Sequence, residues 1–183
     1  MKIALPVVFT LALAPLLLSG CAATARSDHM AVMATPQQRM AVTALRGNVA
    51  LLEVSGGQGG RLWTSKVDTA PFAEALSLSL ADAGLLAADP GRARYALSAR
   101  MERLEQPLTG MQLTVTATVS YSLVERASGS ELLHRTYTLP YTAPLSETFG
   151  AFDRMRLANE GAVKANIAAV TEDLVALPLR PAK

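Results

Sequence analysis

The clearest pattern in the chain is a strict alternation of apolar and polar residues over positions 111–125. The odd positions are apolar: Met111, Leu113, Val115, Ala117, Val119, Tyr121 and Leu123. The even positions are polar: Gln112, Thr114, Thr116, Thr118, Ser120 and Ser122. Because successive side chains of a strand point to opposite faces of a sheet, this segment predicts a long strand with one buried face and one polar face.

Similar but shorter patterns flank this strand. Residues 94–105 place Tyr95, Leu97, Ala99 and Met101 on one face, and residues 132–142 do the same with Leu133, Tyr137, Leu139 and Tyr141. The turn residues Ala-Ser-Gly-Ser at 127–130 separate the last two strands, which favours an antiparallel meander of two hairpins. An earlier strand is expected over 48–55, followed by a glycine-rich connector at 56–60. The sequence leaves open which strand this first one pairs with.

Two helical segments complete the pattern. The first begins near 69–71 and ends at Gly84, with an apolar stripe of Phe72, Leu76, Leu80 and Ala83. The second is expected from Ser146 to the residue before Pro178, with an apolar face of Phe149, Phe152, Val163, Ile167, Val170, Leu174 and Leu177. The order β-α-β-β-β-α predicts an α/β (α+β) fold, a two-layer sandwich of a mostly antiparallel four-stranded sheet with two helices on one face.

The first residues carry a separate signal. Met1 and Lys2 precede an apolar stretch over 3–18, and Leu18-Ser19-Gly20-Cys21 follows. A positive start, a short apolar stretch and small residues at its end are typical of a secretory signal peptide. The sequence Leu18-Ser19-Gly20-Cys21 resembles the lipobox of bacterial lipoproteins. That resemblance implies cleavage before Cys21 and a diacylglycerol on its thiol, which would hold the protein to a membrane. In lipoproteins that resemble this one, the residue after the lipidated Cys guides the choice of membrane. By that resemblance, Ala22 implies an anchor in the outer membrane, with the domain facing the periplasm.

These signals divide the chain into four parts. Residues 1–20 are the expected signal peptide, 21–45 a lipidated and poorly ordered tether, 46–178 a single compact domain, and 179–183 a tail. The tether is predicted from its mixed polar composition and its lack of periodicity. A short helix near 37–45 is the alternative.

Composition narrows the function classes. The 183 residues carry 17 Lys+Arg against 15 Asp+Glu, a balance that argues against nucleic acid as a partner. With one Cys and two His, the chain has no internal disulfide framework and no ordinary zinc cluster, so we expect no metal and no cofactor. Ser120, His134 and Asp153 can be combined into a triad on paper, but no nucleophile-elbow spacing supports it, and we expect no catalytic residues.

Three features are candidates for contact with a partner. Trp63 is expected in a loop and is of the residue type most enriched at interface hot spots, and packing over the sheet edge is the alternative. Thr114, Thr116 and Thr118 belong to the polar face of the longest strand, which is either a contact surface or only a solvated face. Arg156 and Glu160 lie in the polar middle of the last helix, where residues 159–161 form either a contact site or a polar seam against the sheet. The arginines near 92–103 are expected to be a solvated surface neutralised by nearby acids.

The lipobox followed by one β-α-β-β-β-α sandwich resembles the small accessory lipoproteins of bacterial envelopes. The lipopolysaccharide-assembly lipoprotein and the auxiliary lipoproteins of ABC-type lipid transporters are similar in element order. This resemblance implies a non-enzymatic accessory or assembly factor whose partner is an envelope membrane protein. The alternative is a periplasmic binder of a small amphiphile, such as a lipid or a peptidoglycan fragment.

Overall fold

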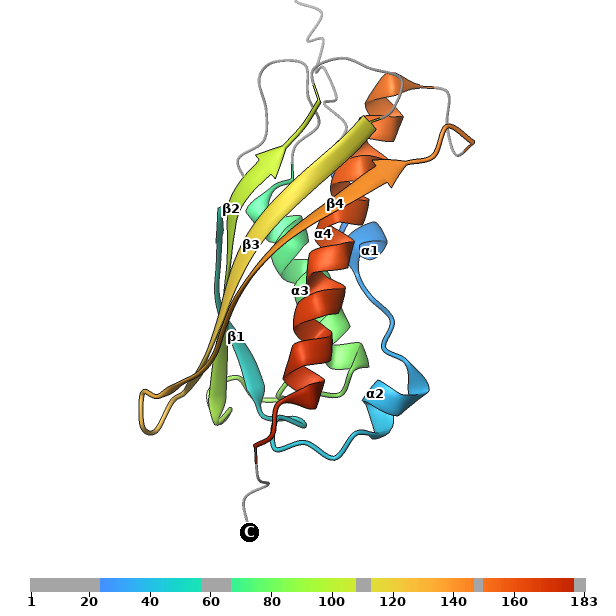
Figure 1. The fold of residues 1–183 in the computed structure, drawn as a ribbon. Coiled ribbons are helices and arrows are strands. Elements are labelled where there is room, and N and C mark those ends of the chain that lie inside the picture. The colour runs from blue at the N-terminus through green and yellow to red at the C-terminus, as the bar shows by residue number, and fades with distance from the viewer. Residues whose placement is uncertain (1–23, 57–66, 108–112, 147–149, 180–183) are drawn as a thin grey trace, which may run out of the picture.

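The computed structural model describes residues 24–56, 67–107, 113–146 and 150–179. Its elements, drawn in Figure 1, are α1 (Ser27–Met30), α2 (Pro36–Met40), β1 (Val49–Gly56), α3 (Thr69–Asp82), β2 (Tyr95–Glu105), β3 (Leu113–Glu125), β4 (Glu131–Ala143) and α4 (Ala151–Ala176). From β1 onward the order is the β-α-β-β-β-α predicted from the sequence.

The four strands form one sheet in the order β1-β2-β3-β4. β2 pairs antiparallel with β3, and β3 antiparallel with β4, which confirms the predicted meander. β1 pairs parallel with β2, and α3 makes the crossover that a parallel pair needs. This pairing answers the question that the sequence left open about the first strand.

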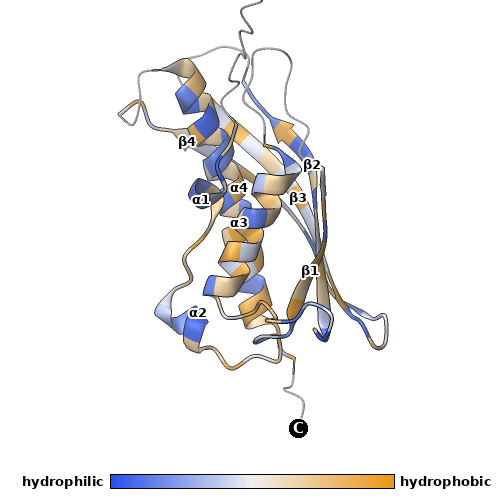
Figure 2. Cartoon of the chain, turned by 180° about the vertical axis from the view of Figure 1, so that it is seen from behind, coloured by the Kyte–Doolittle hydropathy of each residue, from blue (hydrophilic) through white to orange (hydrophobic). Residues whose placement is uncertain are grey.

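One face of the sheet is covered by α3 and α4 (Figures 1 and 2), which confirms the predicted two-layer fold. The odd positions of β3 are buried from Leu113 to Leu123, in agreement with the alternation. They meet the buried residues of α3 and α4, among them Phe72, Leu76, Leu80, Val163, Ile167, Val170 and Leu174. Gly84 follows α3 with φ +72°, the left-handed conformation expected where a helix ends on glycine.

The start of the last helix differs from the prediction. α4 begins at Ala151 with Gly150 as its N-cap, not at Ser146. Phe152 was expected to open the apolar face, but it is 63% exposed. The reason is that the buried positions of α4 begin only at Met155, so its first turn lies outside the core. Phe149 is not among the described residues.

The N-terminal part of the domain is the largest departure from the sequence prediction. The described residues 24–45, which we call the N-terminal arm, were predicted to be a poorly ordered tether, yet Met30 and Leu45 are completely buried. The arm is also held by polar contacts: Val32 N–H donates to Ser79 Oγ at 2.9 Å, and Ala34 N–H donates to Asp82. It packs on α3 and α4 because those helices offer both an apolar surface and fixed acceptors. The alternative of a short helix is partly right, since α2 forms over Pro36–Met40.

A glycine sets how closely α4 approaches the sheet. A Cβ atom on Gly161 would overlap the ring of Tyr141 in β4. The ring therefore occupies the space that a side chain at position 161 would need. In an ordinary helix interior, alanine is more favourable than glycine by about 1 kcal/mol.

We therefore predict that Gly161→Ala lowers the free energy of unfolding, by about 1–3 kcal/mol, because overpacking forces Tyr141 or α4 to move. Urea denaturation followed by far-UV circular dichroism measures this change. Adding Tyr141→Ala removes the overlap. The double variant should therefore lose less free energy of unfolding than the sum of the losses in the two single variants. A stabilising Gly161→Ala would show that the ring does not limit the packing of α4.

Candidate functional site

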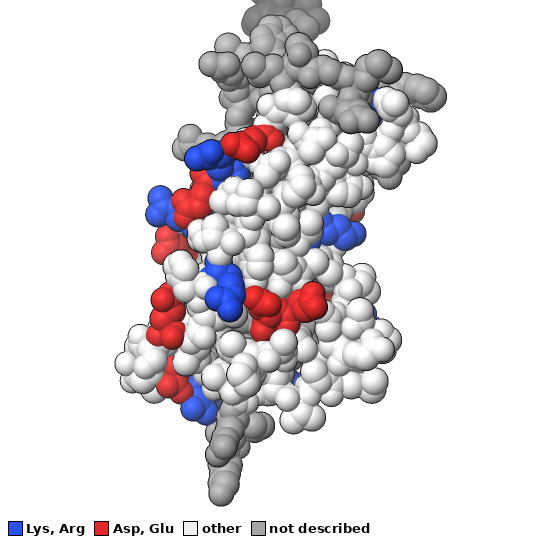
Figure 3. All heavy atoms as spheres, in the orientation of Figure 1, with Lys and Arg blue, Asp and Glu red and all other residues white. Residues whose placement is uncertain are grey.

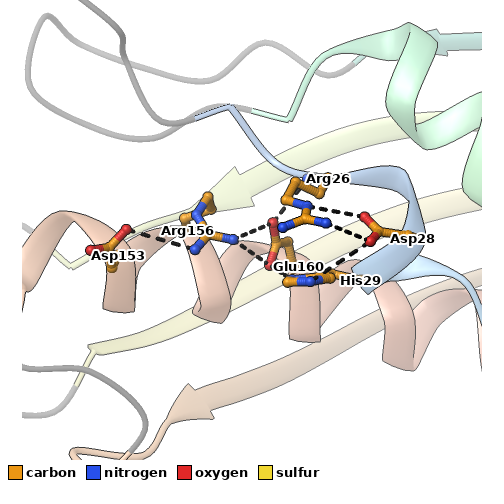
Figure 4. Close-up of polar contacts among 6 residues, drawn as sticks. All are labelled: Arg26, Asp28, His29, Asp153, Arg156 and Glu160. Atoms are coloured by element: carbon orange, nitrogen blue, oxygen red, sulfur yellow. Dashed lines mark hydrogen bonds and ion pairs between the residues drawn. The ribbon is translucent and has the colours of Figure 1, made fainter.

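A buried carboxylate joins the N-terminal arm to the last helix. Glu160 lies in α4 and is only 2% exposed. Its oxygens accept hydrogen bonds from Arg156 Nη1 at 3.0 and 3.2 Å and from the Arg26 backbone N–H at 2.9 Å. His29 Nδ1 lies 3.0 Å from Glu160 Oε2. Figure 4 shows that the arm and α4 meet at this carboxylate.

Acidic residues at the rim of the cluster hold its cationic side chains. Asp28 accepts hydrogen bonds from the Arg26 guanidinium at 2.7 and 3.2 Å, and this lowers the pKa of the Asp28 carboxyl. Asp153 lies 3.6 Å from Arg156, one turn before it in α4. We call Arg26, Asp28, His29, Asp153, Arg156 and Glu160 the arm cluster (Figure 4). His29 belongs to the segment that was predicted to be a poorly ordered tether, yet its ring is bound to Glu160 in this cluster.

The middle of α4 is a polar seam against the rest of the domain. Asn159 is fully buried and accepts a hydrogen bond from Gln106 Nε2 at 2.7 Å. Asn166, also fully buried, donates to the carbonyl of Ala117 in β3 at 3.1 Å. Of the two interpretations that the sequence left open for residues 159–161, the structure favours the polar seam. Glu160 was a candidate partner contact, but it is only 2% exposed, and its oxygens are bound to Arg156 and to the backbone of Arg26.

A groove lies beside the arm cluster, between α1, α4 and the end of β4. Its volume is about 500 Å³. It is lined by apolar and charged side chains together: Asp28, His29, Val32, Tyr141, Leu157, Glu160, Gly161, Lys164, Ala165 and Ala168. Such a lining offers both an apolar surface and polar groups at one place.

The opposite face of the sheet is covered with hydroxyl groups. Thr114 and Thr142 hydroxyls are 2.7 Å apart, those of Thr118 and Thr138 are 3.1 Å apart, and those of Ser120 and Thr136 are 2.9 Å apart. Thr116 lies opposite Pro140 in the same register. We call these residues of β3 and β4 the hydroxyl face. No described helix packs on it, so the candidate contacts Thr114, Thr116 and Thr118 lie on the open side of the sheet.

Ser120, His134 and Asp153 do not form a catalytic triad in the structure. Ser120 and His134 lie on the open face of the sheet, where the Ser120 hydroxyl pairs with Thr136 and His134 pairs with Glu131. Asp153 lies on α4, in the other layer, beside Arg156. Within the described ranges, no group of three or more His, Cys, Asp and Glu side chains could hold a metal ion.

Several arginines of the surface lie beside acidic side chains. Arg94 lies 2.8 Å from Glu125, Arg103 3.1 Å from Glu105 and Arg100 3.6 Å from Glu102. On the side displayed in Figure 3, basic and acidic side chains also lie next to one another. This agrees with the prediction of a solvated surface neutralised by nearby acids. Cys21 and Trp63 lie outside the described residues, so the structure does not place them.

Sequence reasoning missed the arm and found Glu160 only as one of two possibilities. One signal was available for the arm: Thr35 and Gln38 form a capping box, in which Thr35 accepts from Gln38 N–H and Gln38 accepts from Thr35 N–H, and Pro36 occupies the first helical position. That pattern marks a helix start inside the predicted tether. No comparable pattern marks residues 24–34, whose contacts are with distant parts of the chain.

Comparison with known proteins identifies the fold. Protein XCC0632 from Xanthomonas campestris, of family model DUF330, matches with a TM-score of 0.55 at 13% identity, over 70% of this chain and 83% of its own. A protein from Caulobacter crescentus CB15, provisionally described as a lipoprotein, matches with a TM-score of 0.51 at 15% identity, over 72% of this chain and 90% of its own. Protein CT253 from Chlamydia trachomatis has the same TM-score of 0.51 and 15% identity, over 71% of this chain and 98% of its own. No protein-family model and no curated protein sequence matches the chain.

We predict that Glu160→Gln lowers the free energy of unfolding by about 3 kcal/mol, since removing one partner of a buried ion pair leaves the other charge uncompensated. The arm should also detach, so that trypsin cleaves after Arg39 faster than in the unaltered protein. Glu172→Gln is the matched control, because Glu172 is exposed on the same helix. Equal stability and equal cleavage of the two variants would show that the arm cluster does not hold the arm.

Proposed function

We propose that this chain is a lipid-anchored protein of a bacterial envelope, acylated at Cys21 after removal of residues 1–20. The observation that carries the proposal is the sequence Leu18-Ser19-Gly20-Cys21 at the end of an apolar segment. The structural likeness to a protein provisionally described as a lipoprotein supports it. In the described residues, no helix is long and apolar enough to cross a bilayer. Ala22 assigns the anchor, in this proposal, to the outer membrane, with the domain in the periplasm.

We further propose that the protein is a non-enzymatic accessory of an envelope complex and binds a membrane-protein partner through the hydroxyl face. This surface runs along two long strands and lies opposite the helices. Most of its side chains are threonines, which are short and β-branched, so little side-chain entropy is lost when a partner covers them. Trp63 stays a candidate for the same contact, while Arg156 is engaged mainly with Glu160.

A photo-crosslinking residue at Thr118 should therefore capture an envelope membrane protein in cells. The same residue at Glu172, exposed on the opposite layer, is the control and should give a much lower yield. Cys21→Ala should move the protein out of the membrane fraction and lower the yield at Thr118. Equal yields from Thr118 and Glu172, with Cys21 intact, would contradict the hydroxyl face as the contact surface.

The groove beside the arm cluster favours a second candidate function, the binding of a small amphiphile. Leu157, Val32 and Ala168 provide an apolar lining, and Lys164 provides a cationic group at the same groove. A lipid or a peptidoglycan fragment with an apolar part and an anionic group fits this combination.

Under this second function, the protein purified from cells carries a bound amphiphile, detected by native mass spectrometry. Ala168→Trp fills the groove and should remove the bound mass. Ala176→Trp, an exposed position at the end of the same helix, should keep it. A protein that is free of ligand, or a ligand retained by Ala168→Trp, would count against the groove as a binding site.

A further inference from the structure

The arm cluster limits how far the domain can lie from the proposed anchor. Cys21 precedes Thr24, the first described residue, by only three positions, and a chain spans at most about 3.6 Å per residue. The anchoring residue is therefore within about 11 Å of Thr24. Ala25 is buried and Arg26 is bound to Glu160, so this end of the arm is fixed to the domain. This step rests on the acylation of Cys21 proposed above.

The anchored end of the domain can also be identified. In Figure 4 the arm comes in from the N-terminal end of α4, passes Arg26 and continues along the helix to α1. An acylated Cys21 would thus hold the beginning of α4 close to the bilayer. The end of β4 lies at the same end of the molecule as the beginning of α4 (Figure 1).

Two large apolar side chains are exposed at this end. Phe152, in the first turn of α4, is 63% exposed, and Leu145, two residues after β4, is 53% exposed. Neither contributes to the core that the helices form with the sheet. An aromatic and an aliphatic side chain exposed beside a lipid anchor suit the boundary between headgroups and acyl chains, where burial of apolar area adds to membrane affinity.

We infer that Phe152 and Leu145 form a membrane-contact surface that enters the bilayer interface next to the anchor. The bilayer is the occupant that fits, because the short connection to Cys21 places these side chains beside it. With the anchor as a second attachment, this contact fixes the orientation of the domain instead of leaving it to swing on its lipid. Leu52 in β1 and Leu78 in α3 are also exposed apolar side chains, and they belong to other elements of the fold.

The test uses the acylated protein that begins at Cys21, reconstituted into vesicles of phosphatidylethanolamine and phosphatidylglycerol. The chain has a single Cys, and acylation consumes its thiol, so an introduced Cys can be labelled selectively with a polarity-sensitive fluorophore. Phe152→Cys and Leu145→Cys report on the proposed surface. Leu52→Cys and Leu78→Cys are matched controls at exposed apolar positions. These four positions are exposed, so labelling them leaves the core intact.

We expect blue-shifted emission at positions 152 and 145, and quenching by spin-labelled lipids at least about twofold stronger than at 52 and 78. Equal quenching at all four positions would overturn the membrane-contact surface. The mass of the purified protein separates this failure from that of the proposed function. If Cys21 is acylated but positions 152 and 145 stay in water, only the contact surface is wrong, whereas an unacylated Cys21 removes the anchor on which both depend.

Discussion

The buried carboxylate of Glu160 is the constraint on which the arrangement of this domain depends. An ionised carboxylate that is removed from water costs several kcal/mol unless charged and polar groups compensate it. Its own helix supplies only Arg156, and the remaining partners, the Arg26 backbone and His29, come from the N-terminal arm. The arm is therefore required by the chemistry of α4. Once it is in place, Met30 and Leu45 can enter the core.

The same helix shows how polar contacts complement apolar packing. Apolar side chains on a helix tolerate small shifts along a sheet, whereas a hydrogen bond between fixed atoms does not. Asn166 is bound to the Ala117 carbonyl, and Asn159 is bound to Gln106. Between these two asparagines in α4, Gly161 leaves free the space that the ring of Tyr141 occupies. These contacts select one position of α4 on β3 and β4. The groove beside Tyr141 and Leu157 has its shape because that position is fixed.

Elements whose pattern is local could be predicted from the sequence. The alternation over 113–123 and the stripe of Phe72, Leu76 and Leu80 depend only on the period of a strand or a helix, and both are buried as predicted. The pairing of β1 with β2 and the packing of the arm depend on contacts between distant residues, which periodicity does not encode. Met30 lies in a helix of four residues, too short to show an amphipathic stripe, so its burial left no pattern to find. Glu160 was identified from the sequence as a candidate residue. Whether it lies in a polar seam or on a contact surface depends on its contacts with distant residues, which the sequence pattern does not show.

The fixed arm also changes what the proposed anchor can do. A flexible tether of some twenty residues would let the domain point in any direction, and then neither face would have a defined relation to the membrane. With the arm bound along α4, the helix of 26 residues extends about 39 Å from the anchored end. The hydroxyl face runs along β3 and β4. Under the proposed function it would therefore lie in the periplasm at a fixed distance from the bilayer. A partner embedded in that membrane would then meet the face in one orientation, which favours binding because little rotational freedom is left to lose.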